Sequence, residues 1–164
     1  MKVVLENLTK KFPGRNKRAK GDVIAVNNFN MEIPDGKLIG LLGPSGCGKS
    51  TALNLLCGLQ KPTEGKIFFG EDDVTNLPAE NRGVGMVFQN YALYPHLTVK
   101  QNITFPLENL KGEAKMTKEE MSKKAYEVAK LVQIDELMER KPGELSGGQQ
   151  QRVAIARALV KMPR

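Results

Sequence analysis

The sequence contains no long apolar run and only two cysteines. No stretch of its 164 residues approaches the roughly 18 to 20 consecutive apolar residues that a membrane-spanning helix needs. Residues 1–8 alternate charged and apolar side chains and lack the apolar segment of a secretory signal peptide. Cys47 and Cys57 form neither a CxxC pair nor a disulfide framework. These absences argue against a spanning helix and a disulfide scaffold, and they predict a cytoplasmic protein.

Basic residues outnumber acidic ones, which gives a formal net charge of +7 and a pI near 9.4. Such a charge is one sign of a nucleic-acid partner. Much of the excess, however, lies in a single run that also contains Pro13 and Gly14 and almost no apolar side chains. We predict that this run is a solvated loop rather than a binding surface; its basic residues are Lys10, Lys11, Arg15, Lys17, Arg18 and Lys20.

The first half of the chain has the pattern of an α/β protein. β-Formers and short apolar runs bounded by turn residues predict strands, and an apolar segment closed by Gly58 predicts a helix. The expected strands are residues 3–5, 23–33, 37–42, 66–69 and 84–88, with 37–42 buried, and the expected helix is residues 51–57. The hydrophobic content of 40% is enough for one domain with its own core.

After Gln89 the pattern becomes helical. Thr98 can cap a helix that runs through Phe105 and ends at Pro106. Capping-box spacing predicts two further helices, one after Thr117 and one from Ser146 through Val160. The helix after Thr117 has an apolar stripe formed by Met121, Ala125, Val128, Ala129 and Val132. Strands followed by helices predict an α/β core with an inserted helical subdomain.

Residues 43–51 match the phosphate-binding pattern GxxxxGK(S/T). Glycines let backbone N–H groups curl around an anion, and a helix start adds its positive dipole end. Lys49 can reach phosphate oxygens, Ser50 is placed to bind Mg²⁺, and Thr51 lies beside the phosphates. A plain glycine turn would not need Lys-Ser-Thr at the helix start. The predicted nucleotide-binding residues of this loop are Gly43, Pro44, Ser45, Gly46, Cys47, Gly48, Lys49, Ser50 and Thr51, with Cys47 a small filler and Cys57 a core residue.

A second glycine-containing helix start indicates a family. Leu145, Ser146, Gly147, Gly148 and Gln149 form a sequence that is similar to the LSGGQ signature of the ABC ATPase family. On its own the motif would be a helix cap, but it follows a P-loop. The resemblance implies a P-loop NTPase core with an antiparallel β subdomain and a helical subdomain. It also implies that ATP is the cofactor and that the signature completes the ATP site of an opposite subunit in a homodimer or a paired ABC ATPase.

Residues 87–99 resemble the Q-loop of bacterial importers, most closely those for carbohydrate uptake. The resemblance implies that Gln89 contacts Mg²⁺ and the attacking water, and that Tyr91–Val99 faces a transmembrane permease subunit, with a solute-binding protein as an indirect partner. A strand-to-helix loop with buried aromatic residues is the alternative for Tyr91 and Tyr94. His96, the only histidine, is expected to face solvent or a partner rather than to act as the switch histidine of the family.

Phe12 stands where the family places an aromatic residue that stacks on adenine, since stacking needs only a π-face. The basic run that follows it is a departure from the family pattern, so a core or strand-end role stays open for Phe12. The resemblance divides the chain into a nucleotide-binding core (1–90), a helical subdomain (91–145) and the signature with its helix (146–164).

The Walker B strand, with its aspartate and catalytic glutamate, has no counterpart in the sequence, because no apolar run ends in Asp-Glu. We therefore expect a fragment, or the ordered part of a longer chain, that binds nucleotide with Lys49 and Gln89 assisting but does not hydrolyse it alone. The expected parent is an ABC-type ATPase that energises an importer at the inner face of the membrane, with no nucleic-acid partner. The alternatives are a non-transport ABC ATPase acting on nucleic acid or ribosomes, and a nucleotide-binding module without catalysis.

Overall fold

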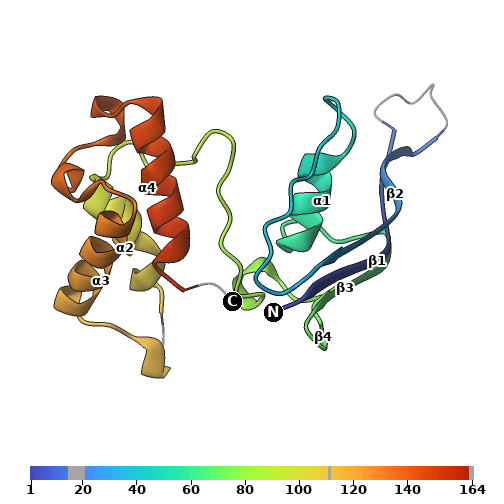
Figure 1. Ribbon diagram of the computed structural model, residues 1–164, viewed down its shortest axis with the longest axis horizontal. Helices are drawn as coiled ribbons and strands as arrows, with labels where there is room; N and C mark the ends of the chain where they lie inside the picture. The colour runs from blue at the N-terminus through green and yellow to red at the C-terminus, as the bar shows by residue number, and fades with distance from the viewer. Residues whose placement is uncertain (15–20, 111, 163–164) are drawn as a thin grey trace. The chain divides into compact units, whose positions relative to one another are not determined.

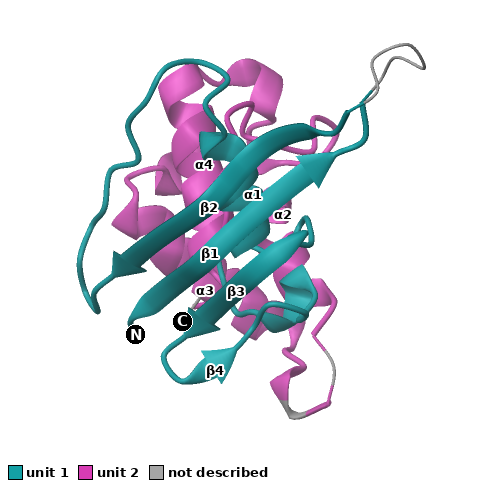
Figure 2. Cartoon of the chain, turned by 90° about the vertical axis from the view of Figure 1, so that its right-hand side faces the viewer, with its two compact units in different colours: residues 1–84, 164 teal, residues 85–163 magenta. Residues whose placement is uncertain are grey.

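The computed structural model describes residues 1–14, 21–110 and 112–162, and it divides the chain into two compact units. Unit 1 comprises residues 1–84 and unit 2 residues 85–163 (Figure 2). Each unit has its own hydrophobic core. The predicted combination of an antiparallel β subdomain, an α/β segment around the P-loop and a helical subdomain is confirmed.

In its described residues, unit 1 is a four-stranded antiparallel sheet with one α-helix packed on it (Figure 1). The strand order is β2-β1-β3-β4, and the strands are β1 (Val3–Phe12), β2 (Val23–Ile33), β3 (Glu64–Phe69) and β4 (Asp72–Asp73). Helix α1 (Lys49–Leu56) buries Ala52 and Leu55. These two side chains join the unit 1 core, whose other buried members are Leu5, Leu8, Val26, Ile67, Phe69 and Val74.

Strand β1 is longer than the predicted residues 3–5. Leu5 and Leu8 are both buried, although residues three apart in a regular strand point to opposite faces. A bulge resolves the conflict: the pairing register with β2 shifts between Leu5 and Leu8, and Asn7 takes φ 48°. Lys10 and Lys11 also lie in β1 rather than in a loop, while residues 15–20 of the basic run lie outside the described residues.

Two predicted strands, residues 37–42 and 84–88, are absent from the sheet that the described residues form. Leu38 and Leu42 are 98% and 94% exposed. An apolar run becomes a strand only where a neighbouring strand takes up its backbone hydrogen bonds, and none of the four strands described pairs with either segment. Leu41 and Val84 still pack against the unit 1 core through their side chains.

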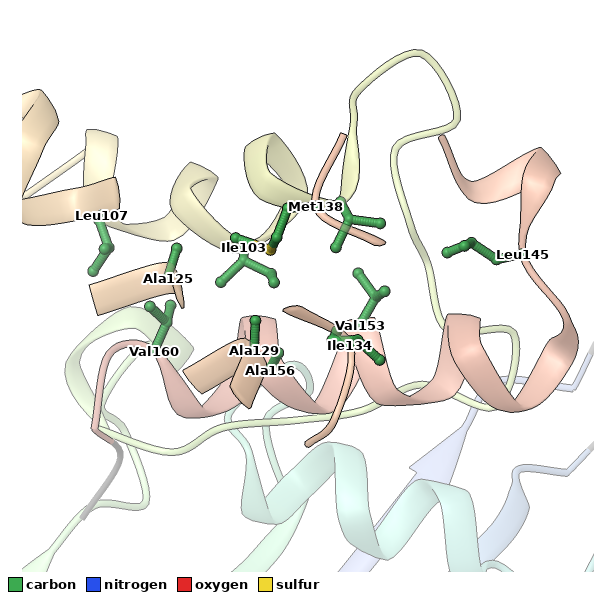
Figure 3. Close-up of a cluster of buried hydrophobic side chains, with 11 residues drawn as sticks. Ile103, Leu107, Ala125, Ala129, Ile134, Met138, Leu145, Val153, Ala156 and Val160 are labelled. Carbon is green, nitrogen blue, oxygen red and sulfur yellow. The ribbon is translucent and has the colours of Figure 1, made fainter. Parts of the chain in front are cut away.

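Unit 2 is helical. Helices α2 (Val99–Glu108), α3 (Lys118–Leu131) and α4 (Gly147–Leu159) enclose a core to which all three contribute (Figure 3). Short 3₁₀ turns connect them at Gly112–Ala114, Asp135–Leu137 and Pro142–Glu144, and a further one, Ala79–Asn81, lies in unit 1. No helix in the described part of the chain has the length and apolarity that crossing a membrane requires.

The predicted helix starts of unit 2 are confirmed. Thr98, Thr117 and Ser146 each cap a helix, and a reciprocal bond from the third helical residue completes a capping box at each start. The predicted end of the first helix at Pro106 is wrong. Pro106 lies inside α2, which continues to Glu108 because Leu107 is buried in the unit 2 core and its packing outweighs the lost backbone bond.

Arg82 is the largest fully buried side chain of the described residues, at 1% exposed. Its guanidinium donates to the carbonyl oxygens of Leu55 and Leu56 at the end of α1, at 2.7 and 2.8 Å. It also donates to Thr75 and Leu77 at 3.0 and 2.9 Å. Burial lowers the pKa of Arg82, an effect that the nearby Cys57 opposes. Arg82 thus ties the end of the P-loop helix to the segment after β4.

We expect Arg82→Met to lower the free energy of unfolding by about 3 kcal/mol, because four buried or part-buried carbonyl groups would each lose a charged donor. Urea denaturation followed by circular dichroism measures the change. Arg140→Met, at an exposed arginine, is the control and should fall within about 0.5 kcal/mol of the wild type. Equal effects of the two substitutions would contradict this account of Arg82.

Candidate functional site

The P-loop connects the exposed segment before it to α1 through glycines that no other residue replaces easily. Gly46 and Gly48 have φ 80° and 91°, in the left-handed region that favours glycine. A Cβ on Gly48 would lie 2.3 Å from the carbonyl oxygen of Ala25 in β2. Gly48 therefore allows the loop to approach the sheet closely, and this approach fixes where α1 begins.

Lys49 lies at the first position of α1 and folds back over its own loop. Its Nζ donates to the carbonyl oxygens of Gly43 and Pro44, both at 2.7 Å, and lies 3.4 Å from Cys47 Sγ. The side chain is solvent-accessible, so a phosphate can compete for the ammonium protons. Cys47 is exposed and Cys57 buried, as the sequence predicted for a loop filler and a core residue. Burial raises the pKa of the Cys57 thiol, while the charge of Arg82 acts the other way.

The start of α1 is electrostatically prepared for an anion. Its first turn contains no acidic residue, and Gly48 makes no side-chain cap bond. The first N–H groups of a helix have no acceptor within the helix, and the helix dipole places positive charge there. Ser50 is exposed and Thr51 half-buried beside these groups. The arrangement can bind phosphate oxygens through N–H groups, the Lys49 ammonium and two hydroxyls.

Phe12 closes β1, where it pairs with Val23 at the start of β2. Its ring is half-buried, and Lys10 Nζ lies 5.2 Å from the ring centroid. An aromatic ring has two π-faces, so a cation beside one face does not exclude a flat ligand on the other. This placement is compatible with both roles that the sequence left open, adenine stacking and a strand-end contact.

The signature motif forms the N-terminus of α4. Ser146 Oγ accepts a bond from the Gln149 backbone N–H at 3.3 Å, and Gln149 Oε1 accepts one from the Ser146 N–H at 2.9 Å. Around Gly147 and Gly148 there is open space at the positions that a Cβ would occupy. Leu145 is only 8% exposed and packs in the unit 2 core, so its side chain anchors the motif. The exposed glycine N–H groups form a second helix start that is free of acidic residues.

Gln89 is exposed and belongs to unit 2, whereas the P-loop belongs to unit 1. Tyr91 and Ala92, which follow it, have φ 61° and 46°, and Tyr94 and His96 are exposed with their rings 6.2 Å apart. The structure therefore brings together the residues of each motif within its own unit. The described residues contain no cluster of three or more His, Cys, Asp or Glu side chains that could hold a metal ion.

Three residues with a clear part in this framework were not predicted from the sequence. They are Arg82 beneath the P-loop helix, Asn102 in α2 and Arg157 in α4; the latter two contact the segment after Gln89. For Asn102 and Arg157 the only signal in the sequence is a polar side chain among apolar helix positions, which does not identify its partner, and Arg82 lies in a turn-rich segment without even that signal. Each of the three side chains donates to backbone carbonyls, which every residue type has, so the sequence gives no clue to the partner.

The chain matches a known protein family over most of its length. The sequence family described as ABC transporter matches residues 26–164, which include the P-loop and the signature. The chain belongs to the ABC transporter family. Several curated relatives of the chain are named as import ATP-binding proteins.

Three of these relatives are named for different imported solutes. The xylose/arabinose import ATP-binding protein XacJ of Haloferax volcanii is 48% identical over 98% of this chain and 39% of its own length. The maltose/maltodextrin import ATP-binding protein MalK of Salmonella typhimurium is 48% identical over 99% of this chain and 41% of its own. The Fe(3+) ions import ATP-binding protein FbpC of Brucella abortus is 50% identical over 98% of this chain and 42% of its own.

Solved ABC cassettes share the fold. A dimeric structure of the ATP-binding cassette MJ0796 in a post-hydrolysis state with ADP and Pi has a TM-score of 0.84 and 39% identity, covering 98% of this chain and 70% of that chain. A second dimeric structure of MJ0796 has a TM-score of 0.83. The chain spans about two fifths of the curated relatives, 39% and 41% in two of them.

The close approach at Gly48 predicts a contrast between two glycines. We expect Gly48→Ala to destabilise the protein by about 2 kcal/mol or more, because alanine is strained at φ 91° and its Cβ would strike the Ala25 carbonyl. Gly147→Ala should be neutral or slightly stabilising, since its Cβ would meet open space at a helix start. Thermal unfolding of both variants measures the difference, and equal melting temperatures would contradict it.

Proposed function

We propose that these residues are the nucleotide-binding part of the ATP-binding subunit of an ABC importer, with a carbohydrate or a similar small solute as the transported substrate. The observation that carries the proposal is that two helices begin at glycine-containing motifs. The P-loop leads into α1, and the signature forms the N-terminus of α4. The importer class is supported by the relatives, whose names include sugars and Fe³⁺ as imported solutes. The carbohydrate assignment rests on the likeness of residues 87–99 to the Q-loop of sugar importers.

ATP would bind with its phosphates at the start of α1. Lys49 would exchange at least one of its loop carbonyl contacts for β- and γ-phosphate oxygens, which are stronger acceptors because they are charged. Ser50 would supply one oxygen ligand to Mg²⁺, with Gln89 as a second candidate. Mg²⁺ keeps several waters and takes further ligands from phosphates, so it does not need a cluster of carboxylates. Phe12 would stack on the adenine ring.

The signature would act on the nucleotide of a second subunit. Gly147 and Gly148 are exposed, with open space where a Cβ would lie, and their N–H groups would form a second site for phosphate oxygens. A head-to-tail dimer, or a pair with a related subunit, brings such a helix start opposite a P-loop. The dimeric state of the MJ0796 cassette supports this arrangement. ATP would then hold the two subunits together.

The membrane partner would be a pair of permease subunits. Tyr91–Val99 would contact them at the inner face of the membrane, where the protein would be a peripheral cytoplasmic subunit. Tyr94 and His96 are exposed in this segment and present an aromatic and a polar surface. The permease and a solute-binding protein would select the solute, and hydrolysis in the complete subunit would drive transport.

We expect ATP binding to depend on Lys49. Lys49→Ala should weaken the binding of a fluorescent ATP analogue by at least about tenfold, because the ammonium contributes charge-assisted bonds to the phosphates. Lys37→Ala, at an exposed lysine outside the loop, should leave the affinity unchanged. Binding that is equal in Lys49→Ala and the wild type would show that the nucleotide does not use the P-loop.

Turnover is a separate expectation. The P-loop and signature residues bind and neutralise phosphate charge, but none of them is a carboxylate that could orient an attacking water. We therefore expect the purified 164-residue chain to bind MgATP without releasing phosphate above background. A phosphate-release assay with Lys49→Ala as the blank tests this, and a rate that disappears in the blank would contradict it.

A further inference from the structure

The segment Tyr91–Leu97, here called the 91–97 loop, has a strained beginning. Tyr91 and Ala92 both have positive φ values, 61° and 46°, although neither is glycine. Such backbone geometry costs free energy, more so for a bulky side chain, and it persists only where surrounding contacts enforce it. Something must therefore hold this part of the loop.

Arg157, in the last turn of α4, holds the beginning of the loop. Its two terminal nitrogens donate to the carbonyl oxygens of Ala92 and Tyr91, at 2.7 and 2.8 Å. The guanidinium carbon lies 5.8 Å from the Tyr94 ring centroid. Burial lowers the pKa of Arg157, with Tyr94 acting in the opposite direction, and an arginine stays protonated in proteins. The two carbonyls that Arg157 binds are those of the two strained residues.

Asn102, in α2, holds the rest of the loop. It is fully buried, its Oδ1 accepts a bond from the Tyr94 N–H at 2.8 Å, and its Nδ2 donates to the carbonyls of Tyr94 and Leu97 at 3.1 and 3.2 Å. The Tyr94 ring also packs on Phe105 of α2, with the centroids 4.6 Å apart. The end of the loop is thus bonded to α2 through Asn102, while its beginning is bonded to α4 through Arg157.

The same helix carries the signature at its other end. Gly147 and Arg157 are ten residues apart in α4, a distance of about 15 Å along a continuous helix. Between them, Val153 and Ala156 are fully buried in the unit 2 core (Figure 3), and the helix is continuous, so its two ends keep a constant separation. A displacement of α4 at its signature end is therefore transmitted to the carbonyls that Arg157 binds.

We propose that Arg157 is a positioning residue that fixes the shape of the 91–97 loop and links it to the signature helix. The proposal deepens the proposed function, on which it rests for the permease as the partner of the loop. Nucleotide contact at Ser146–Gln149 would bias the position of α4, and Arg157 would pass that bias to the surface that the permease contacts. The planar guanidinium can donate to two adjacent carbonyls at once in a fixed geometry. A lysine ammonium is a compact point charge that does not fix this geometry.

Amide hydrogen exchange tests the structural part on the purified chain. The reporters are the amides of Tyr91, Ala92, Tyr94 and Leu97, each of which donates a hydrogen bond. We expect these amides to exchange at least about tenfold faster in Arg157→Gln, since two bonds from a charged donor are lost. The exposed Arg140→Gln is the matched control and should exchange like the wild type.

Arg157→Lys separates positioning from general stabilisation. It keeps the charge and the aliphatic stem, so we expect a melting temperature within about 3 °C of the wild type while the loop amides still exchange several-fold faster. A residue with only a stabilising role would move both quantities together. Loop exchange within twofold of the control in both Arg157 variants would overturn the proposal, and so would a loss of protection spread evenly over unit 2.

The functional part is measured on the complete transporter in lipid vesicles. Arg157→Lys should lower the solute-stimulated rate of ATP hydrolysis about tenfold with the KM for ATP unchanged, while Arg140→Lys should alter neither. Unchanged stimulation in Arg157→Lys would overturn the link to the permease. If the wild-type subunit shows no stimulation by any solute, the proposed importer function fails, whereas the exchange experiment still decides whether Arg157 positions the loop.

Discussion

The start of a helix leaves backbone N–H groups without acceptors, and this chain uses that constraint at both of its candidate sites. At α1 and at α4 the first helical turn carries no acidic side chain. Glycines adjoin each start, so that an anion can approach the backbone. The rest of each unit fixes the direction of one helix: the sheet and Arg82 hold α1, and the apolar core of unit 2 holds α4.

The two helix starts differ in what completes them. Lys49 adds a positive charge at the start of α1, and its ammonium donates hydrogen bonds to two carbonyls of its own loop. The signature has no charged side chain; Ser146 and Gln149 are bound to each other in a capping box and leave the glycines exposed. A site with its own charge suits primary binding of nucleotide, and a neutral one suits a second contact made when another subunit is already loaded. This asymmetry agrees with the division of labour in a head-to-tail dimer.

Short sequence motifs correctly predicted those features of the fold that depend on interactions between residues close in sequence. The capping boxes at Thr98, Thr117 and Ser146 and the left-handed Gly58 just after the C-cap of α1 follow from short-range chemistry, and the structure confirms them. The bulge at Asn7 was missed because it breaks the period-two alternation on which strand prediction relies. Residues 37–42 have the composition of a strand, but pairing depends on neighbours that composition does not specify.

Long-range contacts to backbone carbonyls could not be predicted from the sequence, for a different reason. Arg82, Asn102 and Arg157 bind carbonyl oxygens of residues whose side chains are irrelevant to the bond. Helical periodicity places a residue on a face of its helix but does not reveal which loop passes there. These contacts nevertheless hold the end of the P-loop helix and the 91–97 loop in place.

The central claim is that the backbone N–H groups at the start of α1 bind phosphate. The most direct test follows backbone amide NMR resonances while MgATP is added to the chain. We predict that the resonances of Gly46, Gly48, Lys49 and Ser50 shift downfield and saturate together, because charged phosphate oxygens become their acceptors. Shifts that map to other residues, with the P-loop resonances unchanged at saturating nucleotide, would contradict the account.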